Sequence, residues 1–470
     1  MTRLTTVLTV TSALMWTGFH SGAALAQEGQ VLTTQNEVGG VYEGEFQGGL
    51  QHGTGTYRLP NGYEYTGEWV QGQIMGKGVA RFPNGSVYEG EFAKGKPEGT
   101  GRIIFSDGGA YEGEWKDGVI NGQGIAVYAN GVRYEGQFLN AQHHGKGVMQ
   151  NPGGYEYDGD WVNGQKQGEA RITYPDGSSY VGGVLAGERH GQGKLVLPDG
   201  LTYVGTWADG QIEGNGTLTQ PNGDVYEGTL VAGRREGQGR VIYANGDVYE
   251  GDFADDRRHG QGTFTGSDGY VYQGAWIAGQ IEGMGRVTYP DGSIYEGLFR
   301  DDLADGKGKI TYPDGSTYDG NWIAGVIDGM GTAVYTNGIV YKGEFKNALN
   351  HGKGVMTYTD GYRYDGDWVE GRRHGQGVAT YADGSVYTGA FVGGQRHGQG
   401  EITMANGFKY SGNWDSGEIS GQGVATYANG DVYEGTFRNG KRQGEGTMRY
   451  ADGQEQSGTW ENGALTESGG

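Results

Sequence analysis

Seven histidines share one regular spacing and are the first candidates for metal chemistry. They are separated by 23 residues or multiples of 23: His52, His144, His190, His259, His351, His374 and His397. If each 23-residue unit adds two β-strands, neighbouring histidines lie roughly 9–10 Å apart. Two ligands of one zinc ion, each about 2.0 Å from the metal, cannot be that far apart. The spacing therefore favours solvated histidines, although the run from His351 to His397 could make its segment mildly pH-sensitive.

Pairs of carboxylates recur with one residue between them. The pairs are Glu43/Glu45, Glu89/Glu91, Glu112/Glu114, Asp158/Asp160 and Asp365/Asp367. Glycosidic acid–base chemistry uses two carboxyl groups, but it needs a pocket that perturbs a pKa. On the open face of a strand these pairs are predicted to form a solubilising surface, with weak calcium or cation binding as the alternative.

Gly-x-Gly steps also recur every 23 residues, and such steps can bind phosphate where a helix follows. No helical pattern follows them here, so they are interpreted as turn and packing glycines. The chain has no cysteine, which excludes disulfide scaffolds, cysteine-ligated metals and thiol nucleophiles. It also has no Ser-His-Asp set and no Gly-x-Ser-x-Gly motif. We therefore expect no catalysis, no cofactor and no bound metal.

Composition narrows the class of partner. Lys+Arg 35 against Asp+Glu 57 in 470 residues gives 35 − 57 = −22, which argues against nucleic acid and anionic membranes. Aromatic residues are 12%, too many for a disordered polar chain. Residues 1–26, with Arg3, an apolar run and the end Ala24-Leu25-Ala26, are predicted to be a cleaved secretory signal peptide. We expect the mature chain in the periplasm or cell envelope, or outside the cell.

The rest of the chain is one repeat. Tyrosines recur every 23 residues from Tyr42 to Tyr433, which defines 18 complete copies without insertion or deletion, and a truncated copy starts at Gln456. We number positions 1 to 23 from this tyrosine and the copies 1 to 19. Position 3 is glycine in all 19 copies, positions 12 and 21 are glycine in all complete copies, and position 5 is almost always aromatic.

Copies such as Tyr88-Glu-Gly-Glu-Phe92 and Tyr433-Glu-Gly-Thr-Phe437 resemble the MORN (membrane occupation and recognition nexus) family. The resemblance covers residues 42–463 and implies consecutive β-hairpins in one twisted antiparallel sheet.

The residues predict the same fold independently. Positions 1 to 5 alternate as a strand does, and positions 7–8 suit a two-residue hairpin turn. This register places position 5 opposite 10, position 3 opposite 12 and position 1 opposite 14, so that aromatic rings lie over glycine backbone. Position 16 is apolar in every copy and falls on the same face. Asn or Asp at position 20 followed by glycine predicts a second, three-residue loop with a left-handed glycine.

Tryptophan and isoleucine test this register. Tryptophan occupies position 5 every 46 residues, apart from one 69-residue step from Trp207 to Trp276, and six complete tryptophan copies carry isoleucine at position 10. Five of the eight complete tryptophan copies have alanine at position 16. No phenylalanine copy has isoleucine at position 10 or alanine at position 16. A larger ring with a smaller neighbour is what close packing on one face requires.

We therefore predict an all-β protein, an elongated single-layer twisted antiparallel sheet that forms a solenoid-like rod of about 18 consecutive β-hairpins. The predicted parts are a signal peptide (1–26), an N-terminal linker or cap (27–41), eighteen repeats (42–455), a truncated repeat or cap (456–463) and a flexible tail (464–470).

A single-layer sheet leaves its aromatic face without a second layer, so this face is the candidate partner surface. Its predicted partner-facing residues are Trp69, Trp115, Trp161, Trp207, Trp276, Trp322, Trp368, Trp414, Ile74, Ile120, Ile212, Ile281, Ile327 and Ile419. Positions 9 and 10 also gather a candidate basic rim at Arg234, Arg235, Arg257, Arg258, Arg372, Arg373, Lys441 and Arg442.

The preferred hypothesis is a non-catalytic scaffold that binds a protein partner or a second copy of itself through the aromatic–glycine face. The alternatives are a cell-envelope glycan-binding protein that stacks sugars on the rings, and peripheral membrane attachment through the basic rim, which the net charge disfavours. Self-packing of the rings without any partner is the remaining interpretation.

Overall fold

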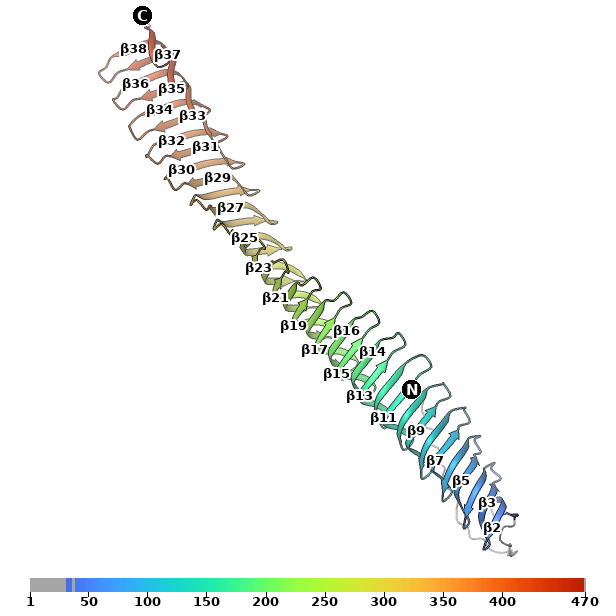
Figure 1. Cartoon of the computed structure of the whole chain (residues 1–470). Helices are drawn as coiled ribbons and strands as arrows, with labels where there is room; N and C mark the ends of the chain where they lie inside the picture. The colour runs from blue at the N-terminus through green and yellow to red at the C-terminus, as the bar shows by residue number, and fades with distance from the viewer. Residues whose placement is uncertain (1–30, 36–38, 469–470) are drawn as a thin grey trace. The chain divides into compact units, whose positions relative to one another are not determined.

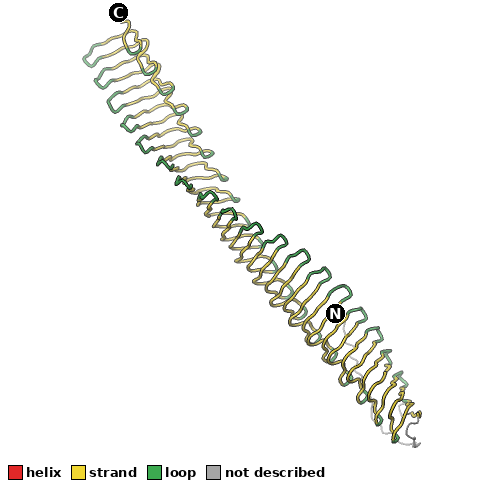
Figure 2. Tube along the Cα trace, viewed as in Figure 1, coloured by secondary structure: helices red, strands yellow, loops and turns green. Residues whose placement is uncertain are grey.

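The computed structural model describes residues 31–35 and 39–468. The predicted signal peptide, residues 1–26, lies outside this range. The chain divides into two units, residues 1–234 and 235–470. Within each unit, antiparallel hairpins follow one another in chain order, and the described residues contain strands and loops but no helix (Figures 1 and 2). The prediction of an all-β array of consecutive hairpins is confirmed.

The strands of the first unit alternate between seven and nine residues after a short first strand. They are β1 (Val31–Gln35), β2 (Val41–Gln47), β3 (Leu50–Arg58), β4 (Glu64–Val70), β5 (Gln73–Arg81), β6 (Val87–Ala93), β7 (Lys96–Ile104), β8 (Ala110–Lys116), β9 (Val119–Val127), β10 (Arg133–Leu139), β11 (Gln142–Gln150), β12 (Glu156–Val162), β13 (Gln165–Thr173), β14 (Ser179–Leu185), β15 (Glu188–Val196), β16 (Thr202–Ala208), β17 (Gln211–Thr219) and β18 (Val225–Val231).

The second unit repeats this alternation, beginning with a strand whose first residue is the last of the first unit. Its strands are β19 (Arg234–Ile242), β20 (Val248–Ala254), β21 (Arg257–Thr265), β22 (Val271–Ile277), β23 (Gln280–Thr288), β24 (Ile294–Arg300), β25 (Leu303–Thr311), β26 (Thr317–Ile323), β27 (Val326–Val334), β28 (Val340–Lys346), β29 (Leu349–Thr357), β30 (Arg363–Val369), β31 (Arg372–Thr380), β32 (Val386–Val392), β33 (Gln395–Thr403), β34 (Lys409–Asp415), β35 (Glu418–Thr426), β36 (Val432–Arg438), β37 (Lys441–Arg449), β38 (Glu455–Glu461) and β39 (Ala464–Ser468).

Both predicted loops are present. In repeat 2, Gln71 and Gly72 have φ values of 48° and 80°, so positions 7–8 form the two-residue turn whose twist suits a hairpin. In the loop of repeat 1, the Gly62 N–H donates to Leu59 O at 3.0 Å, and Gly62 has a φ of 93°. This is a three-residue loop closed by a left-handed glycine, and it is confirmed.

The predicted strand register is correct for the residues that flank the turn, but it is wrong farther from the turn. Trp69 pairs with Ile74, which is position 5 opposite 10, but Gly67 then pairs with Gly78 and Tyr65 with Ala80. Position 3 therefore faces 14 and position 1 faces 16, not 12 and 14. The reason is a β-bulge, in which Glu68 alone opposes the three residues 75–77. The two extra residues preserve the side-chain alternation, so the aromatic face remains continuous.

The core of each unit is one face of its sheet. The tyrosines of position 1 and the rings of position 5 are buried there, together with the apolar residue of position 16 in most copies. At the chain ends, β1 pairs with β2 and β39 pairs with β38. The prediction of a flexible tail from residue 464 is therefore corrected for residues 464–468. Within the described residues, no helix is long and apolar enough to cross a bilayer.

Candidate functional site

The aromatic row consists of the side chains at positions 1 and 5. Where position 5 is aromatic, its ring contacts the tyrosines of its own and the preceding repeat edge to face. Tyr318, for example, contacts Trp322 at 5.7 Å and Phe345 at 5.0 Å between ring centroids. Aromatic pairs prefer this geometry, which adds to the free energy gained by burial. The row therefore stabilises each hairpin against its neighbour.

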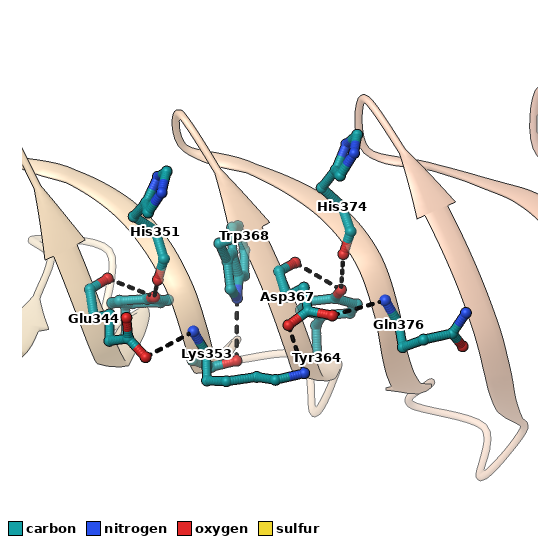
Figure 3. Close-up of polar contacts among 10 residues, drawn as sticks. Glu344, His351, Lys353, Tyr364, Asp367, Trp368, His374 and Gln376 are labelled. Atoms are coloured by element: carbon teal, nitrogen blue, oxygen red, sulfur yellow. Dashed lines mark hydrogen bonds and ion pairs between the residues drawn. The ribbon is translucent and has the colours of Figure 1, made fainter.

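Glycine backbone and buried hydrogen bonds hold these rings. The Tyr364 hydroxyl donates to Asp367 O at 3.0 Å, and its ring lies over Gly377. The Trp368 Nε1–H donates to Gly354 O of the preceding repeat at 3.0 Å (Figure 3). The expectation that rings lie over glycine is met at position 14. Because each polar ring atom has a partner inside the sheet, the row needs no water and no ligand to complete it.

The candidate tryptophans are buried among these contacts. Relative exposure is 2–8% for all eight, from Trp207 at 2% to Trp115 and Trp322 at 8%. The isoleucines opposite them are buried at Ile74, Ile120 and Ile281 and half-buried at Ile212, Ile327 and Ile419. The rings thus present almost no free surface for a sugar or a peptide. On this face, the side chains exposed to solvent are those that cover the aromatic row.

The covering side chains come from positions 10, 18 and 22. Tyr128 at position 18 contacts His143 at position 10 of the next repeat, with 2.6 Å between Oη and Nε2. Tyr335 and Asn350 are hydrogen-bonded in the same relation. Arg373 at position 10 donates to the hydroxyl of Tyr362, which is at position 22 of the preceding repeat. These contacts cover the aromatic row from both ends of the hairpins.

The position-4 members of the candidate carboxylate pairs close the bulges. Asp367 at position 4 accepts from the Gln376 N–H at 2.9 Å and from Lys353 Nζ at 2.5 Å, and Glu344 accepts from the Lys353 N–H at 3.2 Å (Figure 3). Partial burial would raise the pKa of Asp367, but these hydrogen bonds outweigh it and hold the pKa below its usual value. Position 4 therefore satisfies a backbone donor of its own hairpin. No two of these carboxylates meet at a shared reaction centre in Figure 3.

The position-11 histidines lie beside the turn of the next hairpin. The His259 Nδ1 lies 3.5 Å from the Ala278 N–H, where Glu98 accepts from the Asp117 N–H at 2.7 Å in another copy. In Figure 3 the rings of His351 and His374 point away from the neighbouring carboxylates. Among the described residues, no three His, Asp or Glu side chains are grouped as metal ligands. Position 11 is therefore a turn-capping position.

The residues of the candidate basic rim differ in solvent exposure between positions 9 and 10. Arg234, Arg257, Arg372 and Lys441 at position 9 are exposed, whereas the four residues at position 10 are not fully exposed. Arg258 and Arg442 lie 4.1 Å and 4.2 Å above the rings of Trp276 and Trp460, and each donates to a turn carbonyl of the next repeat. Arg235 and Arg373 lie 5.3 Å and 5.4 Å above Phe253 and Phe391. The rim prediction is thus corrected for position 10, where cation–π contacts join consecutive hairpins.

Two half-buried titratable side chains escaped the sequence analysis. Lys166 stands at position 10 opposite Trp161, where most tryptophan copies have isoleucine, and its Nζ donates to Tyr155 Oη at 2.7 Å. One repeat earlier, His143 stacks on Tyr134 with 3.7 Å between ring centroids. Burial lowers the pKa of Lys166 to about 8. Burial, followed by the charge of Lys166, lowers the pKa of His143 to about 4. For Lys166 the available signal was its departure from the isoleucine of most tryptophan copies. Position 10 varies among the phenylalanine copies, so no such signal marked His143.

Local stability around His143 is expected to depend on pH. The folded pKa of about 4 lies below the unfolded value near 6.5, so the unfolded chain binds the proton first as the pH falls. Stability present above pH 6.5 should be lost progressively between pH 6.5 and 4, by about 3 kcal/mol. Amide hydrogen exchange of β10 to β13 at several pH values measures this. The His143→Asn variant, which has the residue found at this position in repeat 14, should lose the dependence; an unchanged pH profile in the variant contradicts the assignment.

Comparison with protein families identifies the family of the repeat. A family model described as MORN repeat matches 18 segments: residues 42–62, 65–87, 88–110, 111–133, 134–154, 157–179, 180–202, 203–225, 226–248, 249–269, 272–294, 295–317, 318–340, 341–361, 364–386, 387–408, 410–432 and 433–455. Comparison with curated proteins gives no match.

Solved structures give only distant likenesses. One is the TCP10 domain of Danio rerio CPAP in complex with a peptide of Danio rerio STIL, at 14% identity, covering 62% of this chain and 99% of that chain, with a TM-score of 0.20. A second is the TCP10c domain of Drosophila melanogaster Sas-4, at 17% identity, 33% and 93% coverage and a TM-score of 0.21. A third is an inactive virginiamycin B lyase from Staphylococcus aureus, at 12% identity, 63% and 96% coverage and a TM-score of 0.11. None of them superposes with this chain over a whole fold.

Proposed function

Because this chain belongs to the MORN repeat family, we propose that it is a non-catalytic binding scaffold that holds a protein partner or a second copy of itself on the aromatic–glycine face of its sheet. The proposal includes export: after removal of residues 1–26 the scaffold acts in the periplasm, the cell envelope or outside the cell. The pattern at residues 1–26 supports this compartment.

The observation that carries the proposal is the covering layer over the aromatic row. It is half-exposed, it contains apolar and aromatic side chains, and it recurs every 23 residues, whereas the rings beneath it are buried. A partner contacting this layer would meet side chains at the same spacing in each repeat and could make many weak contacts at once. The opposite face carries the carboxylates that close the bulges, together with exposed Lys and Arg.

Burial determines which substitution can test this proposal. A charge at Trp276 or Trp322, with exposures of 3% and 8%, would disrupt the row itself and could not separate binding from folding. Ile327 at position 10 is half-buried on the aromatic face, and Ile323 at position 6, 57% exposed, points to the opposite face of the same hairpin. These two isoleucines form a matched pair.

The chain without residues 1–26 is expected to change from monomer to dimer as its concentration rises, as measured by light scattering. Ile327→Glu should remove the dimer, because a carboxylate would be desolvated in the interface, while Ile323→Glu should leave it intact. Thermal melting of both variants controls for folding. A chain that stays monomeric and captures no protein from its own envelope fraction contradicts the proposal, as does equal loss of the dimer in both variants.

A further inference from the structure

Five consecutive repeats of the second unit carry tyrosine at position 18. They are Tyr289, Tyr312, Tyr335, Tyr358 and Tyr381, which we call the tyrosine ladder. The fold does not require tyrosine at this position, because other copies form the same loop with Leu59, Asn151, Gln220, Gly266 or Met404. An unbroken run of one large aromatic residue at a permissive position suggests a function other than folding.

The ladder is accessible where the aromatic row is not. Tyr312 and Tyr335 are 36% and 40% exposed, and the other three are half-buried. Tyr270 and Tyr362 at position 22 extend the surface, with ring centroids 6.1 Å from Tyr289 and 5.3 Å from Tyr381. The rings are therefore anchored at their base and still offer surface, as binding aromatics do.

Exposed carboxylates accompany the tyrosines at position 20. They are Asp291, Asp314, Asp360 and Asp383, with Asn337 in the remaining copy. Each is fixed by its own loop: the Ser293 N–H donates to Asp291 Oδ1 at 2.8 Å, and the Tyr362 N–H donates to Asp360 Oδ1 at 2.9 Å. Hydrogen bonds from Ser316 hold the pKa of Asp314 below its usual value. The loops thus hold these carboxylates in place beside the rings.

The cations near the ladder offset only part of its charge, because the four aspartates of position 20 outnumber Arg373 and Arg396 at position 10. Arg373 donates to the Tyr362 hydroxyl and to Gly394 O at 2.6 Å, so its guanidinium is occupied within the covering layer. Asp291 lies close enough to Tyr312 to raise the pKa of that phenol, after the larger effect of burial. The ladder is therefore a negatively charged aromatic surface, which favours a cationic ligand.

The period of the ladder selects the conformation of that ligand. Two strands per repeat place successive tyrosines roughly 9.4–9.8 Å apart. A polyproline II helix rises about 3.1 Å per residue and returns to the same side every third residue, after roughly 9.3 Å. The mismatch over four steps is at most about 2 Å. A β-strand, whose side chains alternate, would turn every third side chain to the opposite side.

We propose that the tyrosine ladder binds a basic peptide segment in the polyproline II conformation, with a cationic residue at every third position. The prolines would pack between the rings, and the cations would lie against the carboxylates of position 20. Grooves lined by aromatic side chains bind preformed polyproline II segments at low entropic cost. This inference rests on the proposed function, because it gives a partner chemistry to the covering layer of the same face.

Fluorescence anisotropy of labelled peptides on the full chain tests the period and the charge separately. The peptide (Pro-Pro-Lys)5 should bind, and its affinity should fall with added salt. The peptide (Pro-Pro-Pro-Lys)5 has the same charge and the wrong period, and it should bind about tenfold more weakly, about 1.4 kcal/mol. The peptide (Pro-Pro-Glu)5 should not bind.

Variants locate the site. Tyr312→Ser with Tyr335→Ser should weaken binding at least tenfold, whereas Tyr174→Ser, an isolated position-18 tyrosine between Asn151 and Leu197, should change it less than twofold. Asp314→Asn with Asp360→Asn keeps the loop acceptor and therefore the fold, and should weaken binding about fivefold.

Three outcomes overturn the proposal: no binding of (Pro-Pro-Lys)5, equal binding of the two lysine peptides, or binding that survives both double variants. Chitohexaose that binds the ladder in place of the peptide would assign the surface to glycans and overturn it as well. A chain that dimerises through Ile327 yet does not bind the peptide contradicts this inference alone and leaves the proposed function standing.

Discussion

Gly113→Ala is expected to destabilise the region from β8 to β10 by about 3 kcal/mol, the upper end of the usual cost of overpacking. Gly113 is at position 3 of repeat 4, the position that is glycine in all 19 copies. A Cβ at this position would lie 2.5 Å from Gly124 Cα and from the Tyr111 hydroxyl, and closer still to Gln123 O. Two of these atoms belong to the backbone of a paired strand, so they cannot move without separating the strands.

Gly153→Ala is the matched control. Gly153 lies in the loop of repeat 5, and a Cβ there would meet nothing within 4 Å. It should leave stability unchanged or raise it slightly by restricting the unfolded chain. Because a repeat array can unfold in parts, amide hydrogen exchange resolved by segment is the appropriate measurement for both variants. Equal protection of β8 and β9 in the two variants would refute the packing argument.

The sequence allowed the turns and the tryptophan–isoleucine pairs to be predicted because both are local. Positions 7–8 and 19–21 carry the residues that each turn type needs. Trp69 and Ile74 are joined by only four intervening residues, so their pairing follows from the first turn alone. Contacts that depend on one turn and its flanking residues could therefore be predicted from the sequence.

The bulge was not predicted because alternation survives it. Inserting two residues at 75–77 leaves every apolar side chain on the same face, so the hydrophobic pattern cannot distinguish position 3 opposite 12 from position 3 opposite 14. Gly76 has a φ of 74°, and Glu68 reaches over it, which explains both the glycine at position 12 and many of the acidic residues at position 4. The invariant glycine at position 12 was the signal, because a strand interior does not otherwise need glycine.

Side-chain contacts between one repeat and the next could not be predicted from the sequence either. The Arg442 guanidinium lies over Trp460, eighteen residues later, and Glu98 caps the turn at Asp117, nineteen residues later. Sequence spacing suggests that such residues are near each other, but not whether a long side chain points to solvent or over the neighbouring ring. The position-10 arginines were therefore predicted to be exposed to solvent. In the structure their side chains lie over the rings of neighbouring hairpins.

Lys166→Ile is expected to stabilise the region around β12 and β13 by about 2–3 kcal/mol at pH 7. The folded pKa of Lys166, about 8, lies below the ordinary lysine value of 10.5. At pH 7 the ammonium is charged in both states, and the folded state bears the cost of burying it, about 3 kcal/mol for this shift. The hydrogen bond to Tyr155 and the approach of Nζ to 4.4 Å from the centre of that ring offset part of this cost, so the expected gain is about 2–3 kcal/mol.

Isoleucine fits this site because it already stands opposite tryptophan in six other copies, among them Ile120 opposite Trp115. The reverse change, Ile120→Lys, should therefore destabilise β8 and β9 by a similar amount. The sign of the pH effect is a second check: because the unfolded state holds the proton longer, stability of the wild-type chain should rise between about pH 8 and 10.5, and this rise should be absent in Lys166→Ile. Segment-resolved hydrogen exchange at pH 7 and a denaturant series above pH 8 measure the two effects. If Lys166→Ile proved neutral or destabilising, Lys166 would be stabilising its repeat as the position-10 arginines do, and burial would not be its dominant energetic term.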